Sequence, residues 1–388
     1  MIKTERLVMI PGPTPVVRSI QNEMARPTVA FGDPCFVADY KQLVLDLQEM
    51  WGCGEGGQAF VFAGSGTLGM EMALANTTKR GDKILVCSNG AFGDRFKKMC
   101  LRKGLDMDVL ATDHWGTSIT AEMVEAKLKE KKYAAVTVTH VETSTGVMAP
   151  IAAIGEVLKK HPETIYIVDG VAAAAGAEEN LEKMGIDIVL SCSQKAFGVC
   201  PGLTVLWASK AALDRRASLG ELIPESYCDF NEWVPVMRDP SKYWGTPAVN
   251  LIWSLKESVR IIKEEGLAER YARHIRIAKL IDQSVEKLGF KVAAEEGFRA
   301  PTLTVYLYPA GVDDAKFRAA VAEEGAVVAG CLGEFAGKGF RMGHMGNIDK
   351  HVITGAVAAV ARACVKLGVK ADVAGAMDVL LRGLAQEK

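Results

Sequence analysis

The sequence lacks the features that mark membrane, secreted and nucleic-acid-binding proteins. Its 388 residues contain no run of 18 apolar residues, and residues 1–6 hold no apolar signal core. Basic and acidic residues number 46 and 47, a net charge of −1, so no positive face indicates a nucleic-acid partner. We therefore expect a cytoplasmic protein without a membrane or nucleic-acid partner.

The nine cysteines form no C-x-x-C pair, and the six histidines do not cluster. This scatter excludes the usual zinc-binding spacings and indicates reduced thiols, so we expect no metal. Two cysteines, Cys192 and Cys200, flank Lys195, but small buried filler residues account for them as well as nucleophiles do.

The length and the 49% content of hydrophobic residues favour two domains with separate cores. Apolar strands alternate with helical patterns, which indicates crossover connections and a mainly parallel sheet. Strands are predicted at 58–63, 83–88, 106–111, 134–140, 164–168, 186–191 and 203–208. Helices are predicted at 39–51, 68–77, 94–103, 121–131 and 151–160.

The pattern changes after two long predicted helices at 249–265 and 268–288. Shorter strands then occur at 291–294, 302–307 and 339–342, with helices at 315–323 and from 349 onward. We predict an α/β fold with a large domain (21–260) whose seven-stranded, mainly parallel sheet is flanked by helices, and a smaller C-terminal α+β domain (261–388). Residues 1–20, with three prolines between 11 and 15, are predicted to form an extended arm.

One lysine stands where chemistry is expected. Lys195 follows the apolar strand predicted at 186–191 and precedes a turn rich in glycine and proline. The carboxyl ends of strands in open α/β sheets line ligand crevices, and a desolvated lysine there loses its proton readily. Asp169 ends a neighbouring apolar strand, so the two side chains are expected at one edge of the sheet. An exposed loop lysine and a helix-capping aspartate are the alternative interpretation.

Two further turns follow strands of the same sheet. Ser65, Gly66 and Thr67 lie between a strand and a helix, where backbone N–H groups and hydroxyls bind phosphate, although such turns are also common structural caps. Phe92 follows the next strand and is placed to lie on a planar ring, with a plain core phenylalanine as the alternative. A lysine, an aspartate and a phosphate cradle together favour pyridoxal phosphate.

These motifs resemble the class V, fold-type I pyridoxal-phosphate aminotransferases, most closely the alanine–glyoxylate and serine–pyruvate group. The resemblance runs from about residue 8 to 350. Its carriers are Pro11–Pro13, Gly64–Thr67, Asn89–Gly93, Glu142–Gly146, Val168–Gly170, Ser193–Lys195, Pro201–Leu203, Tyr243–Pro247 and Phe340–Gly346.

The resemblance implies a role for each matching residue. Lys195 would be the Schiff-base lysine and Asp169 the partner of the pyridine nitrogen, and both are our catalytic residues. The implied cofactor contacts are Ser65, Gly66, Thr67 and Gln194 at the phosphate, Phe92 on the ring, Thr143 near the ring oxygen, and Tyr243 and Thr246 at the phosphate of the other subunit. Arg341 would clamp the substrate carboxylate, and Gly12 is placed beside it among the substrate-binding residues.

The implied protein is a homodimer with shared active sites. It would move an amino group from alanine or serine to glyoxylate or pyruvate by a ping-pong mechanism. Two other activities on the same fold stay open: 2-aminoethylphosphonate transamination, and a cysteine desulfurase-type lyase with Cys331 as nucleophile. The sequence departs from the family's usual pattern at Phe92, at Thr67 and in the segment 30–34, and the last departure leaves the amino donor open.

Overall fold

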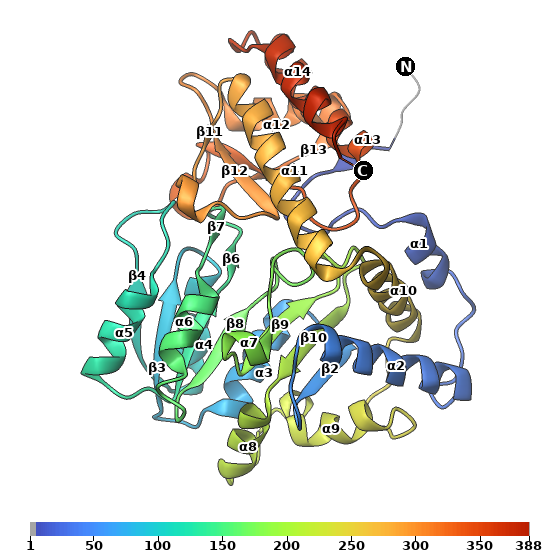
Figure 1. The fold of residues 1–388 in the computed structure, drawn as a ribbon, viewed down its shortest axis with the longest axis vertical. Helices are drawn as coiled ribbons and strands as arrows, with labels where there is room; N and C mark the ends of the chain where they lie inside the picture. Colours follow the sequence, from blue (N-terminus) through green and yellow to red (C-terminus); the bar gives the residue numbers. More distant parts are fainter. Residues whose placement is uncertain (1–4, 388) are drawn as a thin grey trace.

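The structure, a computed structural model, describes residues 5–387 and is built around one large sheet (Figure 1). Its seven strands have the order β2-β10-β9-β8-β5-β3-β4. They span Gln58–Ala63 (β2), Leu203–Ala208 (β10), Ile188–Cys192 (β9), Ile165–Asp169 (β8), Ala135–Thr139 (β5), Lys83–Ser88 (β3) and Asp106–Ala111 (β4). Only β10 runs against its neighbours in this sheet, which confirms the mainly parallel seven-stranded prediction.

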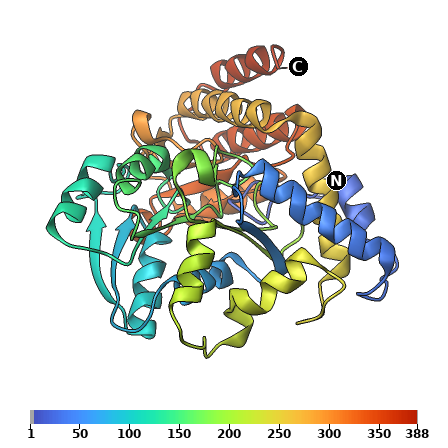
Figure 2. The ribbon, with the colours of Figure 1, turned by 60° about the horizontal axis from the view of Figure 1, so that its bottom comes forward.

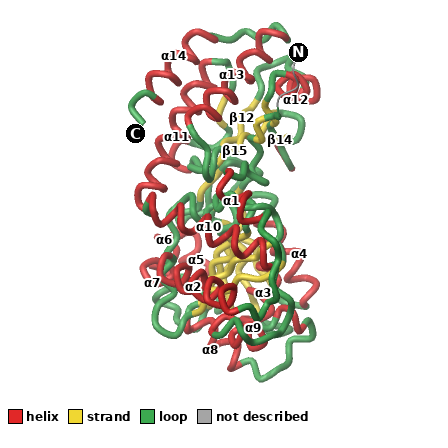
Figure 3. Tube along the Cα trace, turned by 90° about the vertical axis from the view of Figure 1, so that its right-hand side faces the viewer, coloured by secondary structure: helices red, strands yellow, loops and turns green. Residues whose placement is uncertain are grey.

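Helices cover both faces of this sheet. In Figure 3, α6 and α7 lie on one side of the strands and α3 and α4 on the other. The helices of this region are α2 (Pro34–Met50), α3 (Gly66–Thr77), α4 (Gly93–Lys103), α5 (Ala121–Glu130), α6 (Ile151–Leu158), α7 (Leu181–Met184), α8 (Lys210–Ser218) and α9 (Phe230–Arg238). Strands covered on both faces are mostly apolar, and every residue of β5, β8, β9 and β10 is buried.

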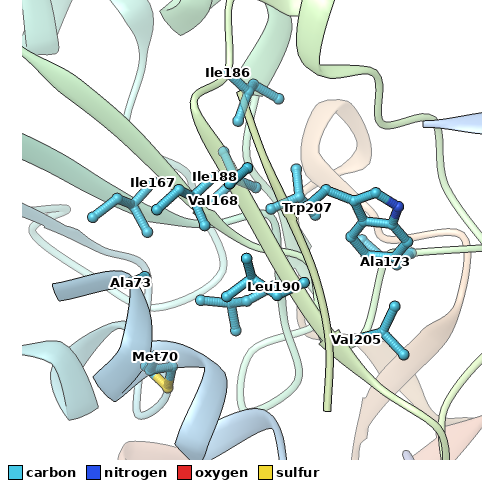
Figure 4. Close-up of a cluster of buried hydrophobic side chains, with 14 of the residues drawn as sticks. Met70, Ala73, Ile167, Val168, Ala173, Ile186, Ile188, Leu190, Val205 and Trp207 are labelled. Atoms are coloured by element: carbon cyan, nitrogen blue, oxygen red, sulfur yellow. The ribbon is translucent and has the colours of Figure 1, made fainter. Parts of the chain in front are cut away.

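The core beneath the site is made by the central strands and one helix. Figure 4 shows Ile167 and Val168 of β8 beside Ile188 and Leu190 of β9, with Met70 of α3 packed nearby. Because β8 and β9 are parallel and pair Asp169 with Leu190, their carboxyl ends meet at one edge of the sheet.

A smaller unit stands above the large sheet in Figure 1. Its sheet has the order β11-β12-β15-β14, all antiparallel. These strands are Lys291–Val292 (β11), Leu303–Leu307 (β12), Gly339–Gly343 (β15) and Ala329–Gly330 (β14), and the helices are α11 (Leu267–Lys287), α12 (Asp314–Glu323), α13 (Lys350–Lys366) and α14 (Val373–Leu384). Helix α10 (Val249–Glu265) leads into α11 but packs on α2, and its buried side chains belong to the core of the large sheet. In Figure 2 the red C-terminal helices lie at the edge of the molecule opposite α8 and α9.

Buried side chains form two clusters. The first cluster, around the large sheet, contains buried residues up to Ile262 in α10 and a few more from Ala300 onward. The second cluster, in the smaller unit, contains Ile277 of α11 and later residues, together with Met9 of the arm. The division of the chain near residue 260 stays a prediction. Within residues 5–387, no helix combines the length and the apolar character that crossing a membrane requires.

The N-terminal prediction was wrong in part. The stretch before residue 20 contains strand β1 (Leu7–Val8), which pairs with β13 (Ala326–Val327), and α1 (Arg18–Met24) begins inside it. The prolines keep residues 11–15 free of helix and strand, but nothing in the sequence prevents regular structure on either side. Helices α8 and α9 were also missed; Pro235 inside α9 conceals its periodicity.

Candidate active site

Lys195 lies in the turn after β9, as the sequence predicted. Its ammonium nitrogen donates to the carbonyl of Pro11 in the arm. Burial lowers the pKa of this amine; Cys192 and Asp169 oppose the lowering, and Arg341 and Arg95 add to it. The arm passes so close that a Cβ at Gly12 would lie 2.6 Å from Lys195 Cδ, and Gly12 has a φ of +105°. Only glycine fits both the conformation and the space there.

The turn that carries Lys195 is held from three directions. Three successive backbone carbonyls each accept a hydrogen bond from a different element. The donors are the Thr14 hydroxyl (2.7 Å to Lys195 O), the Arg270 guanidinium of α11 (2.8 Å to Ala196 O) and the Ser258 hydroxyl of α10 (2.6 Å to Phe197 O). Sequence reasoning missed all three donors, because their partners are distant backbone atoms that no motif reveals.

Asp169 is the last residue of β8 and is 3% exposed. Its carboxylate accepts hydrogen bonds from Val171 N (3.0 Å) and, at 3.4 Å, from the Thr139 hydroxyl. Burial raises the pKa of this carboxyl to about 6; the Val171 bond opposes the rise, and the carboxylates of Glu142 and Glu179 add to it. No cation of the described chain lies within 4.0 Å of it, so Asp169 is a buried acid without a counter-ion.

The predicted phosphate cradle forms at the start of α3. Ser65 is the residue that precedes the helix, and its hydroxyl makes no cap hydrogen bond, so the first N–H groups of α3 and this hydroxyl stay free. The Thr67 hydroxyl accepts a hydrogen bond from Arg95 at 3.0 Å. Across the sheet edge, the side-chain oxygen of Gln194 is buried with no hydrogen-bond partner in residues 5–387. The N–H groups, the hydroxyls and the NH2 group of Gln194 can donate to an anion with several oxygens, whereas the Gln194 oxygen, an acceptor, cannot.

Phe92 directly precedes α4, and its backbone is fixed by a buried carboxylate. Glu142 accepts from Phe92 N (2.9 Å) and Gly93 N (3.0 Å). The same carboxylate accepts from Ser144 N (2.9 Å) and the Ser144 hydroxyl (2.6 Å). Glu142 thus joins the turn that carries Phe92 to the turn that carries Thr143, a role that motif matching alone did not reveal.

Arg341 extends from β15 toward the same edge. It donates to the carbonyls of Gly330 (2.8 Å) and Thr143 (3.3 Å) and forms no ion pair with a carboxylate of the described residues. Burial lowers the pKa of Arg341. The site therefore presents an amine, a buried acid and an unpaired guanidinium, which together can hold a carboxylate-bearing substrate and move protons.

Tyr243 and Thr246 do not join this cluster within the chain. Their hydroxyls lie 3.1 Å apart on the surface, where Tyr243 is 58% exposed and its ring packs on Phe31 at 4.9 Å between centroids. The segment 30–34 serves the fold, because Asp33 caps α2 through Cys35 N and Phe36 N.

Cys331 does not have the character of a mobile nucleophile. It is 8% exposed, and burial raises the pKa of its thiol to about 12, although the nearby Arg341 opposes the rise. A thiol that stays protonated at neutral pH is a poor attacking group.

The comparisons with known proteins agree with this geometry. A model of the family Aminotransferase class-V matches residues 54–337. An uncharacterized aminotransferase from Methanocaldococcus jannaschii is 35% identical over 97% of this chain and 98% of the relative. A serine–glyoxylate aminotransferase from Hyphomicrobium methylovorum is 32% identical over 93% of this chain and 90% of the relative. The crystal structure of a ureidoglycine–glyoxylate aminotransferase from Bacillus subtilis superimposes with a TM-score of 0.93 at 25% identity and full coverage of both chains.

Proposed function

Because this chain belongs to the class-V aminotransferase family, we propose that it binds pyridoxal 5′-phosphate and transfers an amino group from a small amino acid to a 2-oxo acid. The observation that carries the proposal is the set of charged groups without counter-ions at one sheet edge. Lys195, Asp169 and Arg341 are each at least partly buried, and none has an ion pair in the described chain. A cofactor and a carboxylate substrate supply the missing partners.

The residues present fit this cofactor. Asp169 offers a buried carboxylate to a protonated pyridine nitrogen, and Lys195 an amine to the carbonyl carbon. The free N–H groups and hydroxyls at the start of α3, together with the NH2 group of Gln194, can donate to the phosphate. Phe92 and Thr143 complete the contacts at the ring. When bound, the cofactor supplies an electron sink and carries the amino group between the two half-reactions.

The chain's own residues then orient the substrate and move its protons. The lowered pKa of Lys195 keeps a larger fraction of the amine neutral, and a neutral amine can remove a proton and return it at a neighbouring atom. The hydrogen bonds to the Lys195 turn limit where that amine can reach. Arg341 binds the carboxylate that every α-amino acid and 2-oxo acid shares.

The substrate assignment comes from charge and from the relatives. Glyoxylate appears in the names of the Hyphomicrobium and Bacillus proteins, whereas their amino donors differ. We propose glyoxylate or pyruvate as acceptor and alanine or serine as donor, since Arg341 is placed for the single carboxylate that each of these substrates carries. Arg238 lies exposed at the end of α9 and makes no hydrogen bond or ion pair with a described site residue. The buried Cys331 disfavours the lyase alternative.

We also propose a homodimer with shared sites. Tyr243 and Thr246 lie in an exposed loop whose neighbours include two exposed large aromatic side chains, Phe31 (37%) and Tyr227 (39%). Exposed apolar groups of this kind mark protein contacts. If a second copy of the chain packs against this loop, the Tyr243 and Thr246 hydroxyls of one subunit can contact the phosphate bound in the site of the other subunit.

A donor-by-acceptor panel tests the substrates. Each of alanine, serine, glutamate, aspartate and aminoethylphosphonate is paired with glyoxylate and pyruvate, and amino transfer is followed by product chromatography. We expect alanine and serine to turn over with parallel-line, ping-pong kinetics. Arg341→Lys should raise KM for amino and oxo acid alike, because a point charge replaces the two-pronged contact. Preference for glutamate or for aminoethylphosphonate would refute the assignment.

Mixing inactive subunits tests the shared site. Lys195→Ala protein and a Tyr243→Phe, Thr246→Val double variant are combined and allowed to exchange subunits. Partial recovery of activity is expected, since one of the two hybrid sites receives only intact residues. No recovery, with exchange verified by native mass spectrometry, would place the two hydroxyls outside the partner's site.

A further inference from the structure

Arg95 is the residue near the site that the sequence motifs do not explain. It lies in the first turn of α4, with its guanidinium carbon 4.7 Å from the centre of the Phe92 ring and its Nη1 3.0 Å from the Thr67 hydroxyl. The side chain is half-buried, and no carboxylate of residues 5–387 lies within 4.0 Å of it. Its neighbour Asp94 pairs instead with Lys97 at 2.7 Å.

The direction of the hydrogen bond to Thr67 matters. A guanidinium can only donate, so the Thr67 oxygen accepts, and the hydroxyl's own proton is turned toward some other acceptor. The free N–H groups at the start of α3 and the uncapped Ser65 hydroxyl lie next to this oxygen in the chain. Several donors and one uncompensated positive charge thus gather at one helix end, which is the pattern that binds a multiply charged oxyanion.

The backbone of Phe92, the residue under the Arg95 guanidinium, is fixed by the carboxylate of Glu142. Glu142 accepts from the backbone N–H groups of Phe92 and Gly93, which fixes the start of α4. Arg95 N in turn donates to Phe92 O at 3.1 Å. With the backbone fixed in this way, the guanidinium over the ring restrains the orientation of the aromatic plane.

We propose that Arg95 is a positioning residue for the cofactor: it orients the Thr67 hydroxyl toward the phosphate and holds the Phe92 ring in place for stacking. The inference rests on the proposed function, because the phosphate belongs to pyridoxal 5′-phosphate. It joins two cofactor contacts that come from different helices, α3 and α4, through one side chain.

The test compares two ligands on the apo-protein, pyridoxal 5′-phosphate and pyridoxal, which lacks the phosphate. Affinities are measured by fluorescence titration for wild type, Arg95→Met, Arg95→Lys and Thr67→Val. We expect Arg95→Met to weaken pyridoxal 5′-phosphate about tenfold or more, the loss typical of a charge-assisted hydrogen bond, and pyridoxal much less. Arg95→Lys should recover part of the loss, since it keeps the charge but not the fork.

A double variant separates this role from a structural one. If Arg95 acts through the Thr67 hydroxyl, Arg95→Met should cost less in the Thr67→Val background than in wild type. Fully additive losses, equal losses for the two ligands, or no loss would each overturn the inference. Wild-type protein that binds neither ligand would instead refute the proposed function. Thermal unfolding of each apo-variant checks that a loss of affinity is not a loss of fold.

Discussion

Replacing Asp169 by asparagine should stabilise the apo-protein while weakening its hold on the cofactor. The ionised carboxylate is buried near the carboxylates of Glu142 and Glu179 and has no counter-ion in the described chain. Asparagine has the same shape without the charge. Its oxygen can still accept from Val171 N, and its NH2 group can donate to the Thr139 hydroxyl, so both hydrogen bonds of the carboxylate have replacements.

The magnitude follows from the pKa. Burial raises the pKa of Asp169 from 3.8 to about 6, and each pKa unit corresponds to about 1.36 kcal/mol. The ionised folded state is therefore disfavoured by roughly 3 kcal/mol above pH 6. Because the folded-state pKa is raised, this destabilisation is absent below the unfolded pKa near 4, grows as the pH rises from about 4 to about 6, and is then constant.

The assay is urea unfolding of the cofactor-free proteins between pH 4 and pH 8. At pH 8, Asp169→Asn should exceed wild type in free energy of unfolding by up to about 3 kcal/mol, and the difference should shrink toward zero near pH 4. The order should reverse for cofactor affinity, because only the carboxylate pairs with a protonated pyridine nitrogen. A variant less stable than wild type at pH 8, or a difference independent of pH, would refute this reasoning.

Three other substitutions have defined outcomes. Arg270→Met should lower the free energy of unfolding by about 3–5 kcal/mol in urea titrations, because it removes a fully buried guanidinium that donates to Ala196 O and pairs with Glu265. A loss of less than about 1 kcal/mol would contradict the contacts described. Glu142→Gln should lower the free energy of unfolding by about 1–3 kcal/mol for each backbone N–H left unpaired. It should also weaken cofactor binding in fluorescence titrations; unchanged affinity would show that Glu142 does not position Phe92 for the cofactor. Cys331→Ala should leave amino transfer within about twofold in steady-state assays, since the thiol of Cys331 stays protonated at neutral pH; abolished turnover would support the lyase alternative.

Much of the large sheet was predictable because its signals are local. Four of its strands, 58–63, 83–88, 106–111 and 203–208, have the predicted bounds. The strands 58–63 and 203–208 are covered on both faces, so an almost unbroken apolar run marks each of them. The arm was harder to predict. Strand β1 exists because Leu7 and Val8 pair with residues more than 300 positions away, and two residues carry no periodicity.

The site residues likewise fall into those that the sequence predicts and those that it does not. Residues at strand ends or helix starts, such as Lys195 and Asp169, were predictable because the order of elements places them at one edge. Arg95, Thr14 and Arg270 were not, because their importance lies in partners that only folding brings near. Arg95 had a weak signal in its position two residues after the start of α4, beside a predicted stacking residue.

The most direct test of the central assignment is chemical trapping at Lys195. The purified protein is saturated with pyridoxal 5′-phosphate, reduced with borohydride, digested and analysed by mass spectrometry. We predict one cofactor-derived mass on the peptide that contains Lys195 and its disappearance in Lys195→Ala protein. A cofactor mass on a different lysine, or no covalent attachment although the cofactor binds, would contradict the account.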